Sequence, residues 1–250
     1  MNVLVRTKKE LELMRKSGQI SASALKKTLD AVKPGISLQD LEKIAEDEIL
    51  RLGGGVSFKT VPGYRWATCL TINDEVVHGI PRDIELKIGD ILSIDLGAVY
   101  QSWHTDTAWS IVVGKEQNQF LKVGEQALWN GIDQAIEGKR IGDISEAIQN
   151  VVESNGYSIV RSLIGHGVGR ELHEEPEVPG FGKKGTGLVL KKGMTIAIEV
   201  IYTSGSGEVK LSPDGWTIES VDHSMGGLFE MTVVIGEKKA EILTDFRGIK

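Results

Sequence analysis

The N-terminal part of the chain carries a helical pattern of apolar residues. Between Thr7 and Pro34 these residues recur three and four positions apart, which is the spacing of one helix face. Thr7 and Glu10 have the capping-box arrangement at its start, and Pro34 followed by Gly35 ends it. A second amphipathic helix is predicted to begin after Ser37, a residue type favoured at the N-cap.

A similar pair of helices is predicted in the second half of the chain. Apolar residues at helical spacing extend from about Phe120 to Ile136. Another helix is predicted to begin around Gly142, with Asp143 or Ser145 as its N-cap. The order of helix followed by helix thus occurs twice, as expected of a duplicated unit.

The strand-like segments repeat as well. In each half a turn with lysine and glycine leads into an apolar strand that ends on an acid, Asp95 in the first half and Glu199 in the second. The matching segments are residues 86–95 and 190–199. A second acid follows on the next strand-like segment, Asp106 in the first half and Glu230 in the second. The repeat therefore predicts two hairpins that each present paired carboxylates.

Together the repeats predict an α+β fold with two pseudo-symmetric halves, in which an antiparallel sheet is flanked by helices. The halves would span about residues 1–112 and 113–250. A chain of 250 residues can bury a substantial core, and nothing in its composition is typical of a long linker. We therefore expect a single domain over residues 1–250.

The four acids predict a metal site. Any one of them alone would more often be a solvated strand end or half of a surface ion pair, but their repetition favours convergence. Unpaired buried charge costs several kcal/mol or more per ion, so four neighbouring carboxylates require cations. His166, between Gly165 and Gly167, adds an imidazole that can reach a crowded centre. The set is predicted to hold a pair of divalent metals.

The remaining histidines and the cysteine separate into two groups. His78 and His173 lie in loosely related segments, HGIP and HEEP, and are predicted to flank the carboxylates from opposite sides. Each alone would more often be a hydrogen-bonded loop histidine. His104 and His223 show no such relation and are expected to be structural. The single cysteine, Cys69, excludes an intrachain disulfide and is expected to pack as a small apolar side chain.

Charge and hydropathy restrict the partners. A net charge of -6 and a pI near 5.5, with dispersed lysines, argue against a nucleic-acid surface. Residues 1–6 are too short an apolar stretch for a signal peptide, and no later run has the length of a membrane span. We expect a cytoplasmic monomer that binds neither nucleic acid nor membrane.

These residues resemble the type I methionine aminopeptidases, which have the pita-bread (creatinase/aminopeptidase) fold. The resemblance covers nearly the whole chain, and its most specific motifs are segments 73–81 and 165–176 with the acids beyond them. It implies a single catalytic domain with two divalent ions, which the ligand types suggest to be Co, Mn or Fe(II), with Zn not excluded. The positions that match metal ligands of the family are Asp95, Asp106, His166, Glu199 and Glu230.

The resemblance also implies substrate and catalytic roles. His78 and His173 match residues that contact the substrate, and Glu199 matches one that carries a proton in addition to binding metal. The positions that match the wall of the methionine pocket are Tyr64, Cys69 and Trp216. The implied activity is hydrolytic removal of the N-terminal methionine from nascent polypeptides whose second residue is small. Ribosome association is left open.

Some positions depart from the family pattern. Two alternative functions are also consistent with the sequence. The departures are Leu172, Val200, Leu228 and Met231, of which Leu172 stands where an aromatic residue often lines the pocket. A proline-directed aminopeptidase of the same fold would share the metal ligands, but such enzymes usually carry a large N-terminal domain that this chain lacks. A metal-free binding protein on this fold would usually have lost ligands, whereas all five are present here.

Overall fold

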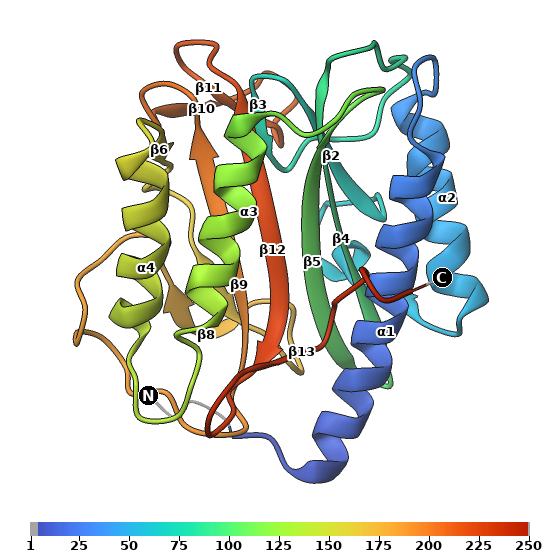
Figure 1. Ribbon diagram of the computed structural model, residues 1–250. Helices are drawn as coiled ribbons and strands as arrows, with labels where there is room; N and C mark the ends of the chain where they lie inside the picture. The colour runs from blue at the N-terminus through green and yellow to red at the C-terminus, as the bar shows by residue number, and fades with distance from the viewer. Residues whose placement is uncertain (1–4, 250) are drawn as a thin grey trace.

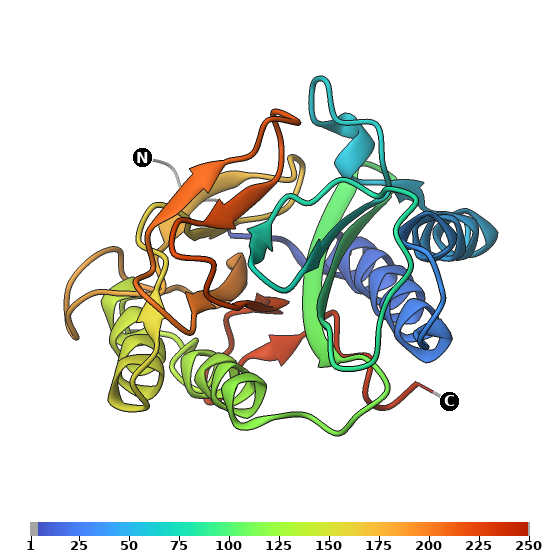
Figure 2. The same ribbon diagram turned by 90° about the horizontal axis from the view of Figure 1, so that it is seen from above.

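A computed structural model describes residues 5–249 of the chain. Residues 1–4, on which the expectation about a signal peptide partly rests, lie outside this range. Two pairs of helices lie on one side of a strongly twisted sheet, one pair against each half (Figures 1 and 2). The helices are α1 (Lys8–Ala31), α2 (Leu38–Arg51), α3 (Gln119–Ile132) and α4 (Ile141–Ser154). Within residues 5–249, no helix is both long and apolar enough to cross a bilayer.

The main sheet is antiparallel and runs in the order β1-β4-β5-β12-β9-β7-β8. Its strands are β1 (Gly55–Val56), β4 (Ile91–Tyr100), β5 (Trp103–Val112), β7 (Gly165–Gly167), β8 (Glu174–Val178), β9 (Thr195–Thr203) and β12 (Gly226–Val234). Three short strands extend it: β2 (Thr68–Ile72) beside β4, β6 (Ser158–Ile159) beside β9, and β13 (Glu241–Ile242) beside β12. A second, small sheet has the order β10 (Val209–Leu211), β11 (Ile218–Ser220), β3 (Glu75–Val77). The predicted α+β class is confirmed.

The core lies between the sheet and the helices because strand side chains alternate between two faces. Ile94, Ile198 and Phe229 are fully buried in this core with residues of the helices such as Leu25 and Leu128. The residues next to them along the strands therefore face the other side of the sheet. That opposite face carries the acids predicted from the sequence.

The seam where β5 meets β12, at the boundary between the two predicted halves, has few main-chain bonds. Strands β5 and β12 pair only at Glu230 with Ala108 and at Met231 with Thr107, whereas β4 and β5 pair along their whole length. Side-chain hydroxyls close the gap. The Thr232 hydroxyl accepts from the Asp106 N–H at 2.9 Å and donates to the Asp106 carbonyl at 2.8 Å. These bonds satisfy buried main-chain groups that an irregular ladder would leave unpaired.

The first two helix starts are confirmed. The Thr7 hydroxyl accepts from the Glu10 N–H while the Glu10 carboxylate accepts from the Thr7 N–H at 2.8 Å, so the capping box is complete. Ser37 caps α2 in the same way, and its partner is Asp40. Both caps depend on groups within four residues of one another, which is why the sequence alone predicts them.

Two other helix predictions are wrong in detail. Helix α3 ends at Ile132, four residues before the predicted Ile136, because the chain there leaves the helix to bridge Gly236. The N-cap of α4 is Arg140, and neither Asp143 nor Ser145. Asp143 instead accepts from the Arg140 N–H at 2.7 Å from its place in the first turn, and the Ser145 hydroxyl donates back to the Ile141 carbonyl at 3.0 Å.

The predicted hairpins are half right. Strands β4 and β5 form a hairpin whose turn holds Gln101 and Ser102 at φ of 48° and 63°. Strand β12, which carries Glu230, pairs directly with β9 but does not follow it in sequence, because β10 and β11 come between. The second pair of acids therefore arises from sheet pairing across an insertion.

Candidate metal centre

Five neighbouring strands each contribute one of the predicted ligands. In sheet order these are Asp95 on β4, Asp106 on β5, Glu230 on β12, Glu199 on β9 and His166 on β7. All five line one cavity of about 550 Å³. Residues up to 135 positions apart in sequence, Asp95 and Glu230, are thus brought to one place by strand pairing.

The strand register arranges these side chains in two adjacent rows. In the first row Asp95 faces Ala108, Ala108 faces Glu230, and Glu230 faces Glu199. The methyl group of Ala108 is thus the only side chain between two of the acids and leaves space there. In the second row the Thr232 hydroxyl bonds the main chain of Asp106, and Ala197 on β9 lies between Thr232 and His166.

Three of the predicted ligands come particularly close together. Asp106, His166 and Glu230 each offer a ligand atom within 4.8 Å of the others, and Nε2 of His166 lies 3.9 Å from Oδ2 of Asp106. Nδ1 of His166 lies 2.9 Å from the Gly167 carbonyl oxygen, which only an N–H can satisfy. This assigns the proton to Nδ1 and leaves the Nε2 lone pair directed at the acids, the usual tautomer of a metal-binding histidine.

The electrostatics of the cluster call for a cation. Burial raises the pKa of Asp106 to about 7, and burial with the nearby charge of Asp106 raises the pKa of Glu199 to about 8. The same two causes raise the pKa of Asp95 and Glu230 well above their ordinary values. Burial lowers the pKa of His166 to about 4, so its ring is neutral. Proton-free carboxylates at neutral pH therefore require positive charge between them.

Two orphaned oxygens support the same conclusion. Within residues 5–249, the buried Oδ1 of Asp95 and Oε1 of Glu230 have no hydrogen-bond partner. Buried carboxylate oxygens are normally satisfied, and each exception requires an explanation. Carboxylate oxygens with one neutral imidazole form a donor set that suits first-row divalent metals. The residues present therefore fit a bound dication.

The cavity also contains the other predicted site residues. His78 and His173 both line it, and the rings of His166 and His173 meet edge to face with centroids 4.5 Å apart. Burial lowers the pKa of His78 and of His173, so both rings are neutral at pH 7. A neutral imidazole can donate one hydrogen bond into the cavity without adding charge.

An apolar wall closes one side of the cavity. Tyr64 and Trp216 meet edge to face with centroids 5.0 Å apart, and the Tyr64 hydroxyl lies 3.2 Å from Sγ of Cys69. Cys69 on β2 is directly opposite Asp95 on β4, which places this wall beside the acids. Burial raises the pKa of the Cys69 thiol well above its ordinary value, so Cys69 packs as a neutral side chain. Leu172 belongs to the same apolar cluster.

Sequence reasoning missed several apolar lining residues. These are Phe58, Val61, Val77, Leu163, Ile164 and Ile201. Most lie in short or irregular segments, where an apolar residue has no periodic pattern to distinguish a cavity wall from the core. His104 and His223 lie elsewhere: Nδ1 of His104 pairs with the Ser57 hydroxyl at 2.7 Å, and the exposed His223 pairs with Asp74 at 2.7 Å.

Comparison with known proteins identifies the family. The model of metallopeptidase family M24 matches residues 12–237. The chain belongs to metallopeptidase family M24. Methionine aminopeptidase 1 of Bacillus subtilis is 42% identical to this chain over 245 residues, which cover 97% of this chain and 99% of the Bacillus protein. The methionine aminopeptidase of Clostridium perfringens is 40% identical, again over 97% of this chain and 98% of the relative.

Solved M24 structures confirm the predicted pita-bread fold. The crystal structure of methionine aminopeptidase from Thermotoga maritima superposes with a TM-score of 0.95 at 41% identity and covers 97% of this chain and 99% of that one. A prolidase from Pyrococcus furiosus has a TM-score of 0.76 at 23% identity, and this chain covers 65% of it. The second likeness shows the shared fold alone.

Two of the four departures from the family pattern lie in the core, and two line the cavity. Val200 and Met231 are buried in the core between sheet and helices, on the side away from the cavity. Leu172 and Leu228 line the cavity itself. The departures that can alter binding in this M24 protein are therefore the two leucines.

Proposed function

We propose that this M24 protein removes the N-terminal methionine from polypeptides by metal-dependent hydrolysis. The observation that carries the proposal is the convergence of five metal-ligand side chains, from five neighbouring strands, in one cavity with an apolar wall. The named relatives, which match almost end to end, support methionine as the residue removed. The substrates would be the N-termini of nascent polypeptides.

Two divalent ions would be held by Asp95, Asp106, His166, Glu199 and Glu230. Such ions supply a water of lowered pKa at neutral pH and polarise the scissile carbonyl. The oxygen-rich set with one imidazole favours Co, Mn or Fe(II), and Zn fits the same donors. The number and identity of the ions are part of the proposal.

The chain's own residues would then move and stabilise charge. Glu199 is the proposed proton carrier, because it lines the cavity among the proposed ligands and the family resemblance gives it this role in addition to metal binding. His173 is proposed to donate a hydrogen bond to the carbonyl oxygen as negative charge develops there. His78 is proposed to act near the scissile nitrogen.

The apolar wall is the proposed methionine pocket. Tyr64, Cys69 and Trp216 would enclose a flexible thioether, and Leu172 completes the wall. Because Leu172 is smaller than an aromatic residue, selection at the first position is expected to be loose. An apolar pocket separates side chains that differ by one methylene by only about 10- to 200-fold, so slow cleavage after leucine or norleucine is expected.

A peptide panel tests this function. Metal-loaded protein is assayed on X-Ala-Ser peptides, with X as methionine, norleucine or leucine, and on Met-X-Ser peptides with small, bulky and proline second residues. We expect the fastest cleavage of methionine before glycine, alanine or serine. Preference for peptides with proline in the second position would instead identify a proline-directed aminopeptidase. Bound metal without cleavage of any peptide would identify a binding protein.

A further inference from the structure

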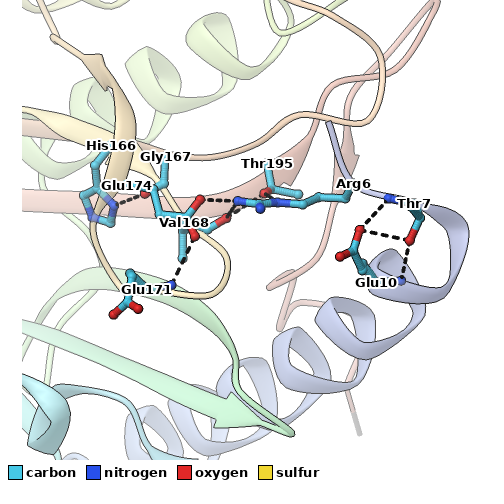
Figure 3. A network of polar contacts seen from close by, with 9 residues as sticks. All are labelled: Arg6, Thr7, Glu10, His166, Gly167, Val168, Glu171, Glu174 and Thr195. Atoms are coloured by element: carbon cyan, nitrogen blue, oxygen red, sulfur yellow. Dashed lines mark hydrogen bonds and ion pairs between the residues drawn. The ribbon is translucent and has the colours of Figure 1, made fainter. Parts of the chain in front are cut away.

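The side chain of Arg6 is buried and reaches Val168 and Glu174, which stand at the two ends of the loop that carries His173 (Figure 3). Its Nε donates to the Thr195 hydroxyl at 3.1 Å, and Nη2 donates to the Val168 carbonyl at 3.3 Å. Nη2 also forms an ion pair with Glu174. The side chains of Arg6 and Glu174 are only 4% and 13% exposed, so this is a desolvated pair and not a surface contact.

The three partners of Arg6 belong to three different parts of the site. Thr195 begins β9, which carries Glu199 four residues later. Val168 follows β7, which carries His166, and Glu174 begins β8 directly after His173. Glu174 itself lines the cavity. One guanidinium thus joins the segments that present the ligands and the proposed substrate histidine.

The fit around the guanidinium is close. A Cβ atom added to Gly169 would lie 2.2 Å from Nη2 of Arg6, so a larger residue at this position would displace the guanidinium from its present partners. Trp103 packs against the same group, with the guanidinium carbon 5.2 Å from its ring centroid. The Arg6 main chain is fixed in turn, because its N–H donates to the Gly193 carbonyl at 2.9 Å.

The ion pair between Arg6 and Glu174 affects the position of His173 more than that of His166. His166 is held by the pairing of β7 with β9, where it faces Ala197. Residues 168–173, by contrast, run in bends outside any strand. Glu174 shapes these bends, because its second carboxylate oxygen accepts from the Glu171 N–H at 3.1 Å. Removal of Arg6 would leave this carboxylate unpaired and nearly buried, which favours rearrangement of the loop.

We propose that Arg6 is a positioning residue for the reaction: through Glu174 it fixes the 168–173 loop and thereby the place of His173 in the cavity. The kinetic part of this inference rests on the proposed aminopeptidase function. The structural part does not, since it concerns only the order of the loop. Arg6 touches none of the proposed reacting atoms and acts through its partners.

Arg6→Ala is compared with wild type in the full-length protein, and Arg15→Ala is the matched control. Arg15 also ties the N-terminal region to the rest of the protein, through Glu241 at 2.8 Å, but that pair is exposed and remote from the cavity. Hydrogen exchange is measured in metal-free protein. We expect faster exchange in residues 168–174 of Arg6→Ala and unchanged exchange there in Arg15→Ala.

The kinetic measurement uses Met-Ala-Ser with metal-loaded protein. Arg6→Ala is expected to lower kcat by about 10-fold, less than the loss from removing a transition-state donor outright. KM and metal stoichiometry should stay unchanged, because His166 keeps its strand pairing. Arg6→Lys retains the charge next to Glu174 and should recover part of kcat, whereas Arg6→Met, which fills a similar volume without the charge, should not.

Glu174→Gln tests the same pair with Arg6 in place, so a failure of Arg6→Ala to fold does not end the test. It should also speed exchange in 168–174, and in the double variant the two effects on kcat should not add. Unchanged exchange in 168–174 in both variants, or the same kcat as Arg15→Ala, would overturn the inference. Inactive wild-type protein would refute the proposed function, while the exchange result would still decide the role of Arg6.

Discussion

Small residues make room for the proposed metal ligands. Ala108 lies between Asp95 and Glu230 across neighbouring strands, and Ala197 lies between Thr232 and His166 in the adjacent row. With larger side chains at these two positions, the acids could not converge. The convergence of these groups therefore depends on the size of the side chain that faces each of them, as well as on their own identity.

Asp106→Asn should abolish peptide cleavage while the protein still folds. A carboxylate oxygen of Asp106 lies within 4.8 Å of the candidate ligand atoms of His166 and Glu230. An amide has no negative charge and only one oxygen, so it cannot replace the carboxylate. The measurement is turnover of Met-Ala-Ser by purified, metal-supplemented protein, with circular dichroism as the control for folding. Turnover near that of wild type would remove Asp106 from the metal centre.

His173→Ala should lower kcat by about 10²-fold, in line with loss of one transition-state hydrogen bond, and leave the metal content unchanged. The reason is that His173 lies in the loop beside His166 and not on a ligand-bearing strand. His166→Ala, measured in parallel, should lose metal. If His173→Ala lost metal and His166→Ala kept it, the two roles would be exchanged.

The sequence pattern reveals the acids of the site, whereas Tyr64, Cys69 and Trp216 are found only through the family resemblance and other lining residues are not found. Asp95 and Glu199 are recognisable because a charge that ends an apolar strand conflicts with its surroundings, and the conflict occurs twice. Phe58 and Leu163 line the same cavity, but an apolar residue in a short segment fits a core and a pocket wall equally well. Only the folded chain distinguishes the two.

At the scale of the elements, prediction succeeds where the interaction is local. The caps of α1 and α2 join residues three positions apart, so the sequence contains both partners. The end of α3 depends on Gly236, about a hundred residues away, and the neighbour of β9 depends on an inserted pair of strands. No periodicity within a short window carries that information.

The seam between the halves gives a prediction at this scale. Thr232→Val keeps the side-chain shape but removes the hydroxyl that bonds both main-chain groups of Asp106. Buried unpaired groups of this kind cost about 1–3 kcal/mol, so the free energy of unfolding should fall by about that amount. Affinity for metal should fall too, since Asp106 is no longer fixed.

Thr71→Val is the matched control for the seam. Thr71 is a buried strand threonine on β2 whose hydroxyl has no hydrogen-bond partner within residues 5–249. Its removal should leave the free energy of unfolding unchanged or slightly higher. Equal losses in the two variants, measured by urea denaturation, would show that the hydroxyl of Thr232 does not hold the seam together.

At the scale of the whole molecule, the buried acids make metal-free protein sensitive to pH. The pKa of each of the four carboxyls is raised by burial, to about 7 for Asp106 and about 8 for Glu199. The unfolded chain has lost these carboxyl protons by about pH 6, and unfolded histidines, whose pKa is about 6.5, are mostly neutral above about pH 7. Stability of metal-free protein should therefore fall as pH rises from about 7 to 8, where the folded protein still retains carboxyl protons.

Each retained proton lowers the free energy of unfolding by about 1.4 kcal/mol per pH unit, which urea denaturation in chelator can resolve. Glu199→Gln removes one of these protons and should reduce the slope, and bound metal should remove the decline. A free energy of unfolding that rose through this range would mean that the acids are not buried together.

The central claim, that the five ligands form a metal centre for methionine removal, is tested most directly by titrating metal-free protein with Mn(II) or Co(II). Heat of binding and cleavage of Met-Ala-Ser are followed in the same samples. The account predicts saturable binding, with cleavage absent at the start and rising as the sites fill. Cleavage that persists in chelator, or full binding that never produces cleavage, would contradict it.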